Sequence, residues 1–409
     1  MYDDLPFVED VDLEGLSVVL RVDINSSIVD GRIEDDERIR RHAKTVAALL
    51  DEGAKVAVLA HQGRPGDPDF TTLEPHHEVM SEVLGDGIEY VPDVFGPAAK
   101  EAIRSLKPGE AVLLENVRFY SEERMNREPE WHAQRHLVRN LAPLFDVFVN
   151  DAFAAAHRSN ASLVGFTRRL PSYVGHVMKR EVEVLDGKVR KEMEDGVFVL
   201  GGSKVGDAMR VIARAVEMDN VKRILLGGLV ANVFLWAEGI DPGRPTRKYL
   251  RDKGYADYVD DARELLEEDE EGKIMVPKDV ALNDGGRRVE VPVEELPSDH
   301  PIFDIGSETI EEYVAEIESA GMVIANGPMG VYEEGGFEKG TYEVLNAMAN
   351  SDAFTVIGGG HIIAAAKACG AYEGMDHVST GGGSMLRLLA GERLPALEAI
   401  RTCPLNEGG

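Results

Sequence analysis

Short apolar runs alternate along this chain with longer segments whose apolar residues recur at helical spacing. Residues 36–50 show the helical pattern, with one apolar face and one charged face. The runs that predict strands are 16–22, 55–60, 111–114 and 147–150 in the first half, and 197–200, 223–226, 322–325 and 353–357 in the second. Strands that are apolar throughout are typical of parallel sheets covered by helices on both faces. The pattern therefore predicts two doubly wound α/β domains.

The boundary between these domains is expected between Ser162 and Glu194. Residues 174–189 predict one long helix that carries charges of both signs, which suits a bridge between domains. At 409 residues, the chain exceeds the length at which a single core stops growing. The dense acidic run at 260–271 predicts a solvated helix end or loop, with partner binding as the less favoured alternative.

Composition excludes several classes of protein. The chain is 44% hydrophobic and 29% charged, which is typical of a globular protein. We expect a cytoplasmic protein, because no apolar run could span a bilayer and the acidic N-terminus does not resemble a secretory signal. Cys369 and Cys403 form no CxxC pattern, so we expect neither a disulfide framework nor a cysteine-based zinc site.

The net charge of −30 argues against a general role in binding nucleic acid or membrane surfaces. Acidic residues number 74 against 44 basic ones, and Arg outnumbers Lys. An acidic, lysine-poor surface is favoured in a high-salt cytoplasm, where salt screens the repulsion between like charges. Composition thus favours a halophilic origin, and an ordinary acidic cytosolic enzyme is the alternative.

Arg and His follow several predicted strands of the first half, in spite of the acidic composition. Ligands of open α/β sheets lie beyond the carboxyl ends of the strands, so these side chains are candidates for one anion site. Guanidinium groups bind carboxylate and phosphate oxygens in pairs. The candidates are Asp23, Asn25, Arg38, Arg40, Arg41, His61, Arg64, Arg118, His157 and Arg158. For any single Arg, a surface ion pair is the alternative.

Glycine clusters end the predicted strands of the second half. Glycine allows a backbone to approach a ligand closely, and the N-terminus of a following helix favours negative charge. The clusters are Gly201 and Gly202, Gly227 and Gly228, Gly358 to Gly360 before His361, and Gly381 to Gly383. Together they predict a phosphate site, with Lys204 at a helix start aimed at the same phosphates. A tight turn without a ligand is the alternative for any one cluster.

Other sites are disfavoured by the absence of their motifs. There is no GxxxxGK[ST], which excludes a P-loop NTPase, and no GxGxxG with a ribose-binding acid, which weakens a nicotinamide-dependent oxidoreductase. His132 and His136 are four residues apart on a predicted helix, which is a spacing that metal sites use. Without HExxH or a nearby third ligand, an ordinary helix face is favoured.

The chain resembles the phosphoglycerate kinase family along nearly its whole length. The motifs RVDIN, HQGRP, LLENVRF, NDAFAAAHRSNAS, VLGGSKV, ANGPMGVYE, VIGGGH and VSTGGG occur in the family's order, and their details are more similar to the archaeal branch. The resemblance implies reversible phosphoryl transfer between ATP and the carboxylate of 3-phosphoglycerate in the cytoplasm. It also implies two Rossmann-like domains joined by a hinge helix, and Mg²⁺ accompanying ATP or ADP.

The resemblance also assigns roles to residues, position by position. The expected substrate ligands are Asp23, Asn25, Arg38, His61, Gly63, Arg64, Arg118 and Arg158. The expected nucleotide ligands are Gly201, Gly202, Lys204, Gly227, Gly228, Asn326, Glu333, Gly359, Gly360, His361 and Ile362. Arg38 and Lys204 are expected to be catalytic, Gly381, Gly382 and Gly383 to offer amides to the transition state, and Glu181, Ser379 and Thr380 to act at the hinge.

By the same resemblance, residues 1–165 form a substrate domain, 166–385 a nucleotide domain, and 386–409 a segment that packs back on the first domain. The expected partners are 3-phosphoglycerate, 1,3-bisphosphoglycerate and ATP or ADP, with the chain acting as a monomer or a homodimer. A carboxylate nucleophile is ionised at neutral pH, so the reaction needs positive charge and positioning rather than a general base.

Two positions depart from the family's pattern. A second Lys often follows the first by four residues, but Ala208 stands there, and His361 replaces an Asp that helps to hold Mg²⁺ with the nucleotide. Arg210 and Asp207 are nearby candidates for the missing charge and metal contact. These departures leave a non-catalytic nucleotide-binding protein of the same fold as an alternative.

Overall fold

The computed structural model describes residues 1–406, which divide into two compact units. Unit 1 comprises residues 1–183 and 393–406, and unit 2 comprises residues 184–392. Each unit is built around a parallel sheet, so the expected α/β fold with two parallel sheets is confirmed. Among the helices of residues 1–406, none has the length and apolarity that a membrane span requires.

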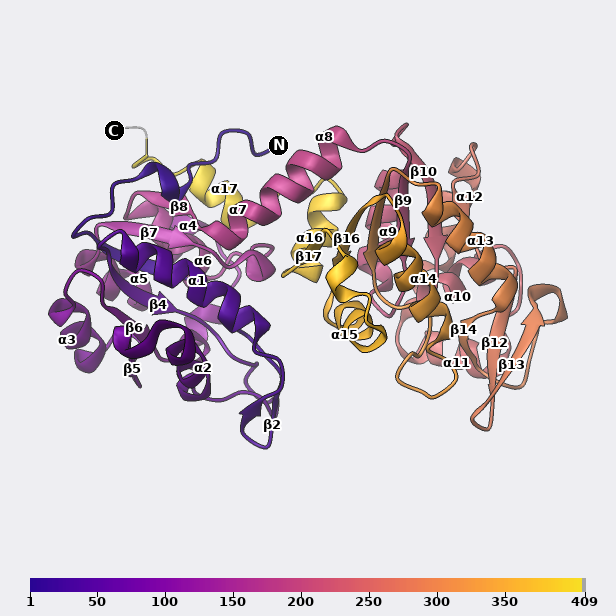
Figure 1. Ribbon diagram of the computed structural model, residues 1–409, viewed down its shortest axis with the longest axis horizontal. Helices are drawn as coiled ribbons and strands as arrows, with labels where there is room; N and C mark the ends of the chain where they lie inside the picture. Colours follow the sequence, from indigo (N-terminus) through magenta and orange to yellow (C-terminus); the bar gives the residue numbers. More distant parts are fainter. Residues whose placement is uncertain (407–409) are drawn as a thin grey trace. The chain divides into compact units, whose positions relative to one another are not determined.

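The sheet of unit 1 has the strand order β5-β6-β4-β1-β7-β8, with all neighbours parallel (Figure 1). Its strands are β1 (Ser17–Arg21), β4 (Lys55–Leu59), β5 (Ile88–Val91), β6 (Ala111–Leu114), β7 (Val147–Asn150) and β8 (Ser172–Val174). Its α-helices are α1 (Glu37–Asp51), α2 (Glu74–Leu84), α3 (Pro97–Ser105), α4 (Pro129–His132), α5 (His136–Leu141), α6 (Ala161–Val164), α7 (His176–Val182) and α17 (Pro395–Arg401). The predicted strands of the first half therefore lie within one or two residues of the observed ones.

Helices cover both faces of this sheet, which is why its strands are apolar throughout. Leu20 of β1 packs with Ile39 and Val46 of α1 in one core cluster. Val19, its neighbour on the strand, belongs to the opposite cluster together with Ile103 of α3. Successive side chains of a strand point to opposite faces, so both must be apolar when both faces are buried.

The sheet of unit 2 repeats this design with the order β11-β10-β9-β15-β16-β17, again parallel. Its strands are β9 (Gly196–Leu200), β10 (Val221–Leu226), β11 (Ile274–Met275), β15 (Met322–Asn326), β16 (Phe354–Gly358) and β17 (His377–Ser379). Its α-helices are α8 (Arg190–Glu192), α9 (Val205–Val216), α10 (Gly228–Ala237), α11 (Arg244–Asp252), α12 (Val259–Glu268), α13 (Ser307–Glu318), α14 (Lys339–Asn350), α15 (Gly360–Cys369) and α16 (Gly382–Leu389). The acidic run forms α12 from the second residue of this helix onward and continues into a turn. Most of its acidic side chains are exposed, as expected for a solvated segment, although the run forms a whole helix rather than a helix end or loop.

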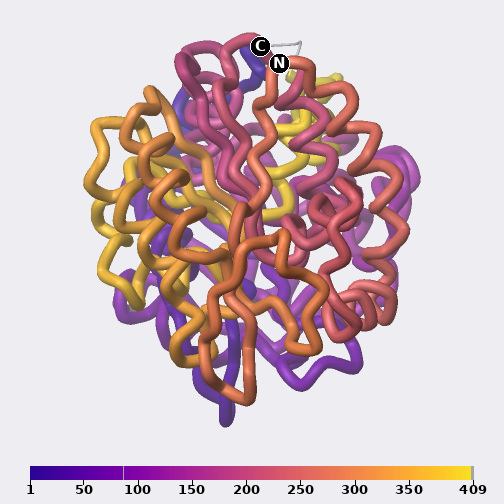
Figure 2. The backbone as a smooth tube through the Cα atoms, turned by 90° about the vertical axis from the view of Figure 1, so that its right-hand side faces the viewer, coloured from indigo at the N-terminus to yellow at the C-terminus, as the bar shows by residue number. Residues whose placement is uncertain are grey.

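The sequence analysis predicted no antiparallel strand pairs. Unit 2 contains a second sheet of order β13-β12-β14, formed by β12 (Asp279–Asp284), β13 (Arg287–Pro292) and β14 (Ile302–Ile305). Figures 1 and 2 show the β12–β13 hairpin, in orange, extending beyond the parallel sheet of unit 2. In unit 1, β2 (Ile28–Val29) pairs with β3 (Arg32–Ile33) in a short hairpin.

The predicted helix at 174–189 begins too early. Val174 is the last residue of β8, and its amide donates to the Pro6 carbonyl, so it belongs to the sheet. The helix starts as α7 at His176, continues through a π-helical stretch at Glu183–Val189, and ends as α8. The two compact units divide inside this helix, between Glu183 and Val184.

The end of the described chain belongs to unit 1. The Leu394 amide donates to the Tyr2 hydroxyl over 2.7 Å, and the Ala396 amide donates to the Ala156 carbonyl over 3.1 Å. Figure 1 shows α17, in yellow, beside β8.

Candidate active site

The loops after β1 and β4 are fastened to each other at the carboxyl edge of the unit 1 sheet. The Asn25 Oδ1 atom accepts from the Gly63 amide over 2.8 Å, and the Asp23 Oδ1 atom accepts from the Asn25 amide over 3.1 Å. Gly63 has φ +62°, and a Cβ there would lie 2.7 Å from the backbone of Asp69 and Phe70. Only glycine fits this turn, which brings the two loops together.

A buried network behind these loops holds His61. Arg21, the last residue of β1, is 1% exposed, and its Nη2 atom lies 2.9 Å from the His61 Nδ1 atom. Its Nε atom donates to the Ser162 hydroxyl over 2.7 Å, and that hydroxyl donates to the Glu123 carboxylate over 2.6 Å. Because guanidinium groups only donate, Nδ1 of His61 is the acceptor, and its Nε2 atom carries the proton.

The charge states of this group follow from burial and neighbouring cations. Burial lowers the pKa of His61 well below its usual value, Asp23 opposes this, and Arg21 and Arg118 add to it. Burial alone would raise the pKa of Asp23, but His61, Arg38 and Arg21 lower it further than burial raises it. Since His61 is neutral at pH 7, the arginines carry that effect. The edge therefore presents a carboxylate, a neutral imidazole and guanidinium groups.

The guanidinium groups crowd one another. Burial, followed by the charges of Arg158 and Arg21, lowers the pKa of Arg118 to about 10. Burial and the charge of Arg64 likewise lower the pKa of Arg158. The Arg118 Nη1 atom donates to the Gly63 carbonyl over 2.5 Å, which holds this guanidinium group at the loop after β4. Arg38 lies 3.8 Å from the Asp23 carboxylate. Cations that depress one another's pKa form a site suited to a small polyanion.

Two arginines that the sequence analysis grouped with this cluster do not belong to it. Arg40 pairs with Asp36 at 2.7 Å and with Glu82, and Arg41 pairs with Glu37. Both face acidic partners on the helix surface because α1 turns them away from the sheet edge.

The histidine pair at 132 and 136 does not share a helix, contrary to the prediction. His132 ends α4, whereas His136 begins α5. The His132 side chain is buried, with its Nε2 atom 3.0 Å from the Ser159 carbonyl. Within residues 1–406, no group of three or more His, Cys, Asp or Glu side chains is arranged to hold a metal ion.

The glycine clusters of unit 2 fall into two kinds. The amides of Gly201, Gly202 and Gly228 donate to carbonyls of Asn326, Pro328 and Met329 over 2.9, 2.8 and 2.6 Å. The Gly227 amide donates to Leu200, and a Cβ at Gly201 would lie 2.2 Å from the Pro328 carbonyl oxygen. These glycines let the loops after β9, β10 and β15 touch. Their amides are occupied, so the expected amide cradle does not apply to them.

The remaining clusters begin helices α15 and α16 and lie next to Lys204. A Cβ at Gly382 would lie 2.9 Å from the Gly359 Cα atom and 3.5 Å from the Lys204 Nζ atom. Lys204 is the N-cap residue of α9, as predicted. First-turn amides of a helix have no acceptor within the helix, so those of Gly360 and Gly383 suit phosphate oxygens. A lysine thus lies beside two helix N-termini.

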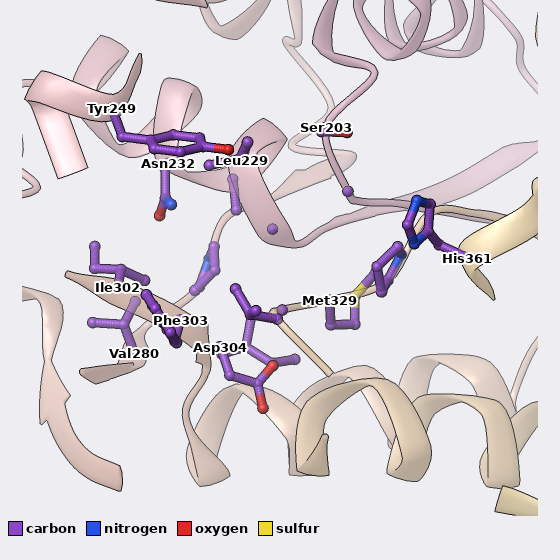
Figure 3. Close-up of a pocket in the computed structure, with 18 of the residues that line it drawn as sticks. Ser203, Leu229, Asn232, Tyr249, Val280, Ile302, Phe303, Asp304, Met329 and His361 are labelled. Carbon is purple, nitrogen blue, oxygen red and sulfur yellow. The ribbon is translucent and has the colours of Figure 1, made fainter. Parts of the chain in front are cut away.

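A cavity of about 870 Å³, open solvent included, adjoins this arrangement in unit 2 (Figure 3). Its lining includes Gly202, Ser203, Glu333 and His361 toward one end, and Asn232, Tyr249, Val280 and Ile302 toward the other. The polar end suits phosphates, and the more apolar end suits a planar base.

The two family departures have defined surroundings. Ala208 is buried on α9, whereas His361 is exposed at the start of α15, with its Nδ1 atom 3.2 Å from Glu333. Arg210 pairs with Asp207 and lies 2.8 Å from Glu392, so its charge is already matched by carboxylates.

The remaining predicted residues occupy buried positions. The Asn326 amide donates to the Gly358 carbonyl, joining β15 to β16. Ser379 ends β17 and Thr380 follows it, both buried in unit 2, and Glu181 is buried on α7 in unit 1.

Sequence reasoning missed Arg21, Glu123, Ser162 and Asn232. Arg21 and Asn232 could have been recognised from the sequence. Arg21 ends a mostly apolar strand, and Asn232 lies within an otherwise apolar helix. Glu123 and Ser162 could not, since they meet Arg21 only in the folded chain.

Comparisons with known proteins agree with this geometry. A family model described as "Phosphoglycerate kinase" matches residues 8–392. A phosphoglycerate kinase from Methanopyrus kandleri is 71% identical over 406 residues, covering 99% of this chain and 100% of that protein. One from Methanothermobacter thermautotrophicus is 48% identical and covers 96% of each chain.

Solved structures show the same similarity. The phosphoglycerate kinase of Pyrococcus horikoshii OT3 superimposes with a TM-score of 0.92 at 41% identity, covering 98% of this chain and 100% of the other. That of Coxiella burnetii gives a TM-score of 0.80 at 30% identity, with 97% and 98% covered.

Proposed function

The chain belongs to the phosphoglycerate kinase family, and we propose that its units divide the substrates between them: unit 1 binds 3-phosphoglycerate and unit 2 binds the nucleotide. The enzyme transfers a phosphoryl group reversibly between ATP and the carboxylate of 3-phosphoglycerate, a step of glycolysis. The carboxylate oxygen attacks the γ-phosphorus and the bond to the β-phosphate oxygen breaks, giving 1,3-bisphosphoglycerate and ADP.

The crowded arginines of unit 1 carry the substrate assignment. Arg158 repels Arg118 and is itself repelled by Arg64, and a ligand that carries a phosphate and a carboxylate relieves that repulsion on binding. Arg forks also match phosphate and carboxylate oxygens. Asp23 and Asn25 then accept from or donate to the substrate hydroxyl, and the His61 Nε2–H group donates to an oxygen. Arg38 neutralises the transferring phosphoryl group.

In unit 2, Lys204 and the first turns of α15 and α16 support a phosphate site. Gly359, Gly360, His361 and Ile362 lie at one helix start, and Gly381 to Gly383 lie at the other. Gly201, Gly202, Gly227 and Gly228 shape the wall. We assign Glu333, which lines the cavity beside His361, and Asn326, which joins β15 to β16, to contacts with the ribose and the adjoining phosphates. No proton needs to be removed from the nucleophile, so these groups act by position and charge.

Magnesium fits this chain as a companion of the nucleotide rather than as a resident ion. Residues 1–406 offer no cluster of three metal ligands. Mg²⁺ is commonly held by phosphates and one or two carboxylates, and Asp207 in the first turn of α9 is the candidate carboxylate. When bound, the ion neutralises phosphate charge.

Transfer requires the two substrates to meet, so we assign a hinge to the helix around Glu181 and to Ser379 and Thr380. The division of the chain inside that helix, at a π-helical stretch, supports this assignment. π-helical turns are often found at functional positions.

We further propose a cytoplasmic enzyme that acts as a monomer or a homodimer. Its acidic composition supports a high-salt setting. With 74 acidic residues against 44 basic ones, salt relieves the repulsion between surface carboxylates. The basic cluster in unit 1 is retained within this acidic surface for the substrate.

A coupled assay with ATP, Mg²⁺ and 3-phosphoglycerate tests the assignment. We expect Lys204→Ala to lower kcat by about 100-fold or more, because it removes a charge at the transferring group, with calorimetric binding of 3-phosphoglycerate nearly unchanged. Arg118→Ala should instead weaken 3-phosphoglycerate binding.

The matched control is Lys222→Ala, whose Nζ atom bonds Ser319 on the surface at 2.8 Å and which should keep full turnover. Unchanged turnover in Lys204→Ala would remove that lysine from the mechanism. Absence of turnover in the unmodified chain would favour the non-catalytic alternative.

A further inference from the structure

Helix α10 carries one side-chain amide in an otherwise apolar sequence. Its residues are GLVANVFLWA, and Asn232 stands among Ala231, Val233 and Phe234, which are all buried. Asn has a poorer helix propensity than Leu or Ala and gains nothing from apolar neighbours. The fold alone does not explain its presence there.

Asn232 is a buried residue whose side-chain amide makes no hydrogen bond with any of residues 1–406, and its amide atoms are accessible rather than enclosed. The residue is 3% exposed, and it lines the cavity of unit 2. Figure 3 shows its side chain extending from α10 toward Ile302, on the side of the cavity away from Ser203 and His361. Because the amide lines the cavity and has no partner among the described residues, a ligand in the cavity can take its hydrogen bonds.

Three other polar side chains of the cavity lie away from Asn232. Ser203, Glu333 and His361 lie toward the phosphate side. The Asp304 Oδ2 atom accepts from Arg288 and from the Gly340 amide, each over 2.8 Å, whereas its Oδ1 atom is buried without a partner within residues 1–406. Figure 3 shows its carboxylate directed away from Asn232.

The surroundings of Asn232 suit a flat aromatic ring. Val280 and Ile302 supply apolar surface, and the ring of Tyr249 lies at the same end of the cavity. A nucleotide with its phosphates at Lys204 and α15 would place its base here.

We propose that Asn232 recognises the edge of the adenine base and sets the preference for adenine over other purines. This rests on the proposed nucleotide site. The amide oxygen accepts from the 6-amino group, and the amide nitrogen donates to the adjacent ring nitrogen, as in the bidentate pairing of Asn with adenine. Guanine presents two acceptors on the corresponding edge, so one half of the amide would remain unpaired.

The test compares ADP with a purine nucleoside diphosphate that lacks the 6-amino group, and with GDP, by calorimetry. The unmodified chain should bind ADP about tenfold more tightly than the analogue, because a hydrogen bond is lost and the amide oxygen is left unpaired. In Asn232→Leu, which keeps the size of the side chain, the ratio should fall to about one.

The kinetic readout separates recognition from a structural defect. In Asn232→Leu, the KM for ATP should rise, while kcat and the KM for 3-phosphoglycerate stay unchanged. Asn350→Leu on α14, outside the cavity lining, is the matched control and should retain the preference for ADP. Asn232→Thr serves as the second variant if the leucine variant does not fold, with the same expected loss of discrimination.

Equal binding of ADP and the analogue by the unmodified chain overturns the inference, as does a preference that persists in the Asn232 variants. Both results leave the nucleotide site of unit 2 in place. A chain that does not bind ADP at all would instead overturn the proposed function, and this inference with it.

Discussion

Single buried polar side chains hold the loops around the arginine cluster at the carboxyl edge of the unit 1 sheet. The Gln62 Oε1 atom accepts from the Ser26 amide over 3.0 Å, and its Nε2 atom donates to the Ser26 carbonyl over 2.9 Å. The same Oε1 atom lies 2.9 Å from the His76 Nε2 atom, which therefore donates. His76 is fully buried, and its Nδ1 atom has no partner within residues 1–406. Protonation there would place an unpaired charge in the core.

His76→Gln should reduce the loss of stability in mild acid. Burial lowers the pKa of His76 from 6.5 to about 4. The unfolded chain therefore binds a proton more readily, and the stabilisation present above pH 6.5 is lost as the pH falls toward 4. The difference between 6.5 and about 4 corresponds to about 3 kcal/mol of unfolding free energy.

Urea titrations at several pH values between 7 and 4 measure this. The same substitution at the exposed His300 controls for the removal of a histidine. An unchanged pH dependence in His76→Gln would contradict the assignment.

At the scale of elements, the position of Lys204 depends on α9 as a rigid unit. Lys204 caps the start of this helix, and Lys273 holds its end. The Lys273 Nζ atom donates to the carbonyls of Val216 and Met218 over 2.9 and 3.0 Å, although the residue is only 4% exposed. A cation at the C-terminus of a helix satisfies free carbonyls and complements the helix dipole.

Lys273→Met should lower the unfolding free energy of unit 2 by about 1–3 kcal/mol, because two buried carbonyls lose their donor. Urea denaturation measures the change. Lys222→Met, at a lysine on the surface of the same unit, should change it by less than about 0.5 kcal/mol. Equal effects of the two substitutions would mean that the cap contributes nothing specific.

For the whole molecule, the decisive property is that the residues proposed to bind the substrate and those proposed to bind the nucleotide belong to different compact units. Asp23, Arg38 and Arg118 belong to unit 1, whereas Lys204 and Gly382 belong to unit 2. A reaction between ligands held on separate units requires a conformational step that also excludes water.

Small-angle scattering should therefore show a smaller radius of gyration with 3-phosphoglycerate and a non-hydrolysable ATP analogue together than with either one alone. The unliganded chain is the reference. No compaction with both ligands bound would count against the hinge at Glu181, Ser379 and Thr380.

Activity and thermal stability should both rise through a KCl series into the molar range, because salt screens repulsion across a surface that carries a net charge of −30. A salt that screens equally well, such as NaCl, controls for a specific effect of potassium. Maximum stability at low salt would contradict the proposed high-salt setting.

The sequence by itself determined the central parallel strands, their glycine-rich or basic ends, and the helix start at Lys204, but it missed β5, β8, β11 and β17. These features are local: a strand buried on both faces must be apolar along its length, as β6 and β9 are. The family motifs added the reaction and the division of residues between substrate and nucleotide.

Tertiary structure decided which of these groups are available to a ligand. It left the first-turn amides at Gly360 and Gly383 without helix acceptors but used those of Gly201 and Gly228 to join loops. It also turned Arg40 toward Asp36 and joined Arg21 to His61, and it left the Asn232 amide facing a cavity. Hydrogen-bond partners come from segments far apart in the chain, so local patterns cannot specify them.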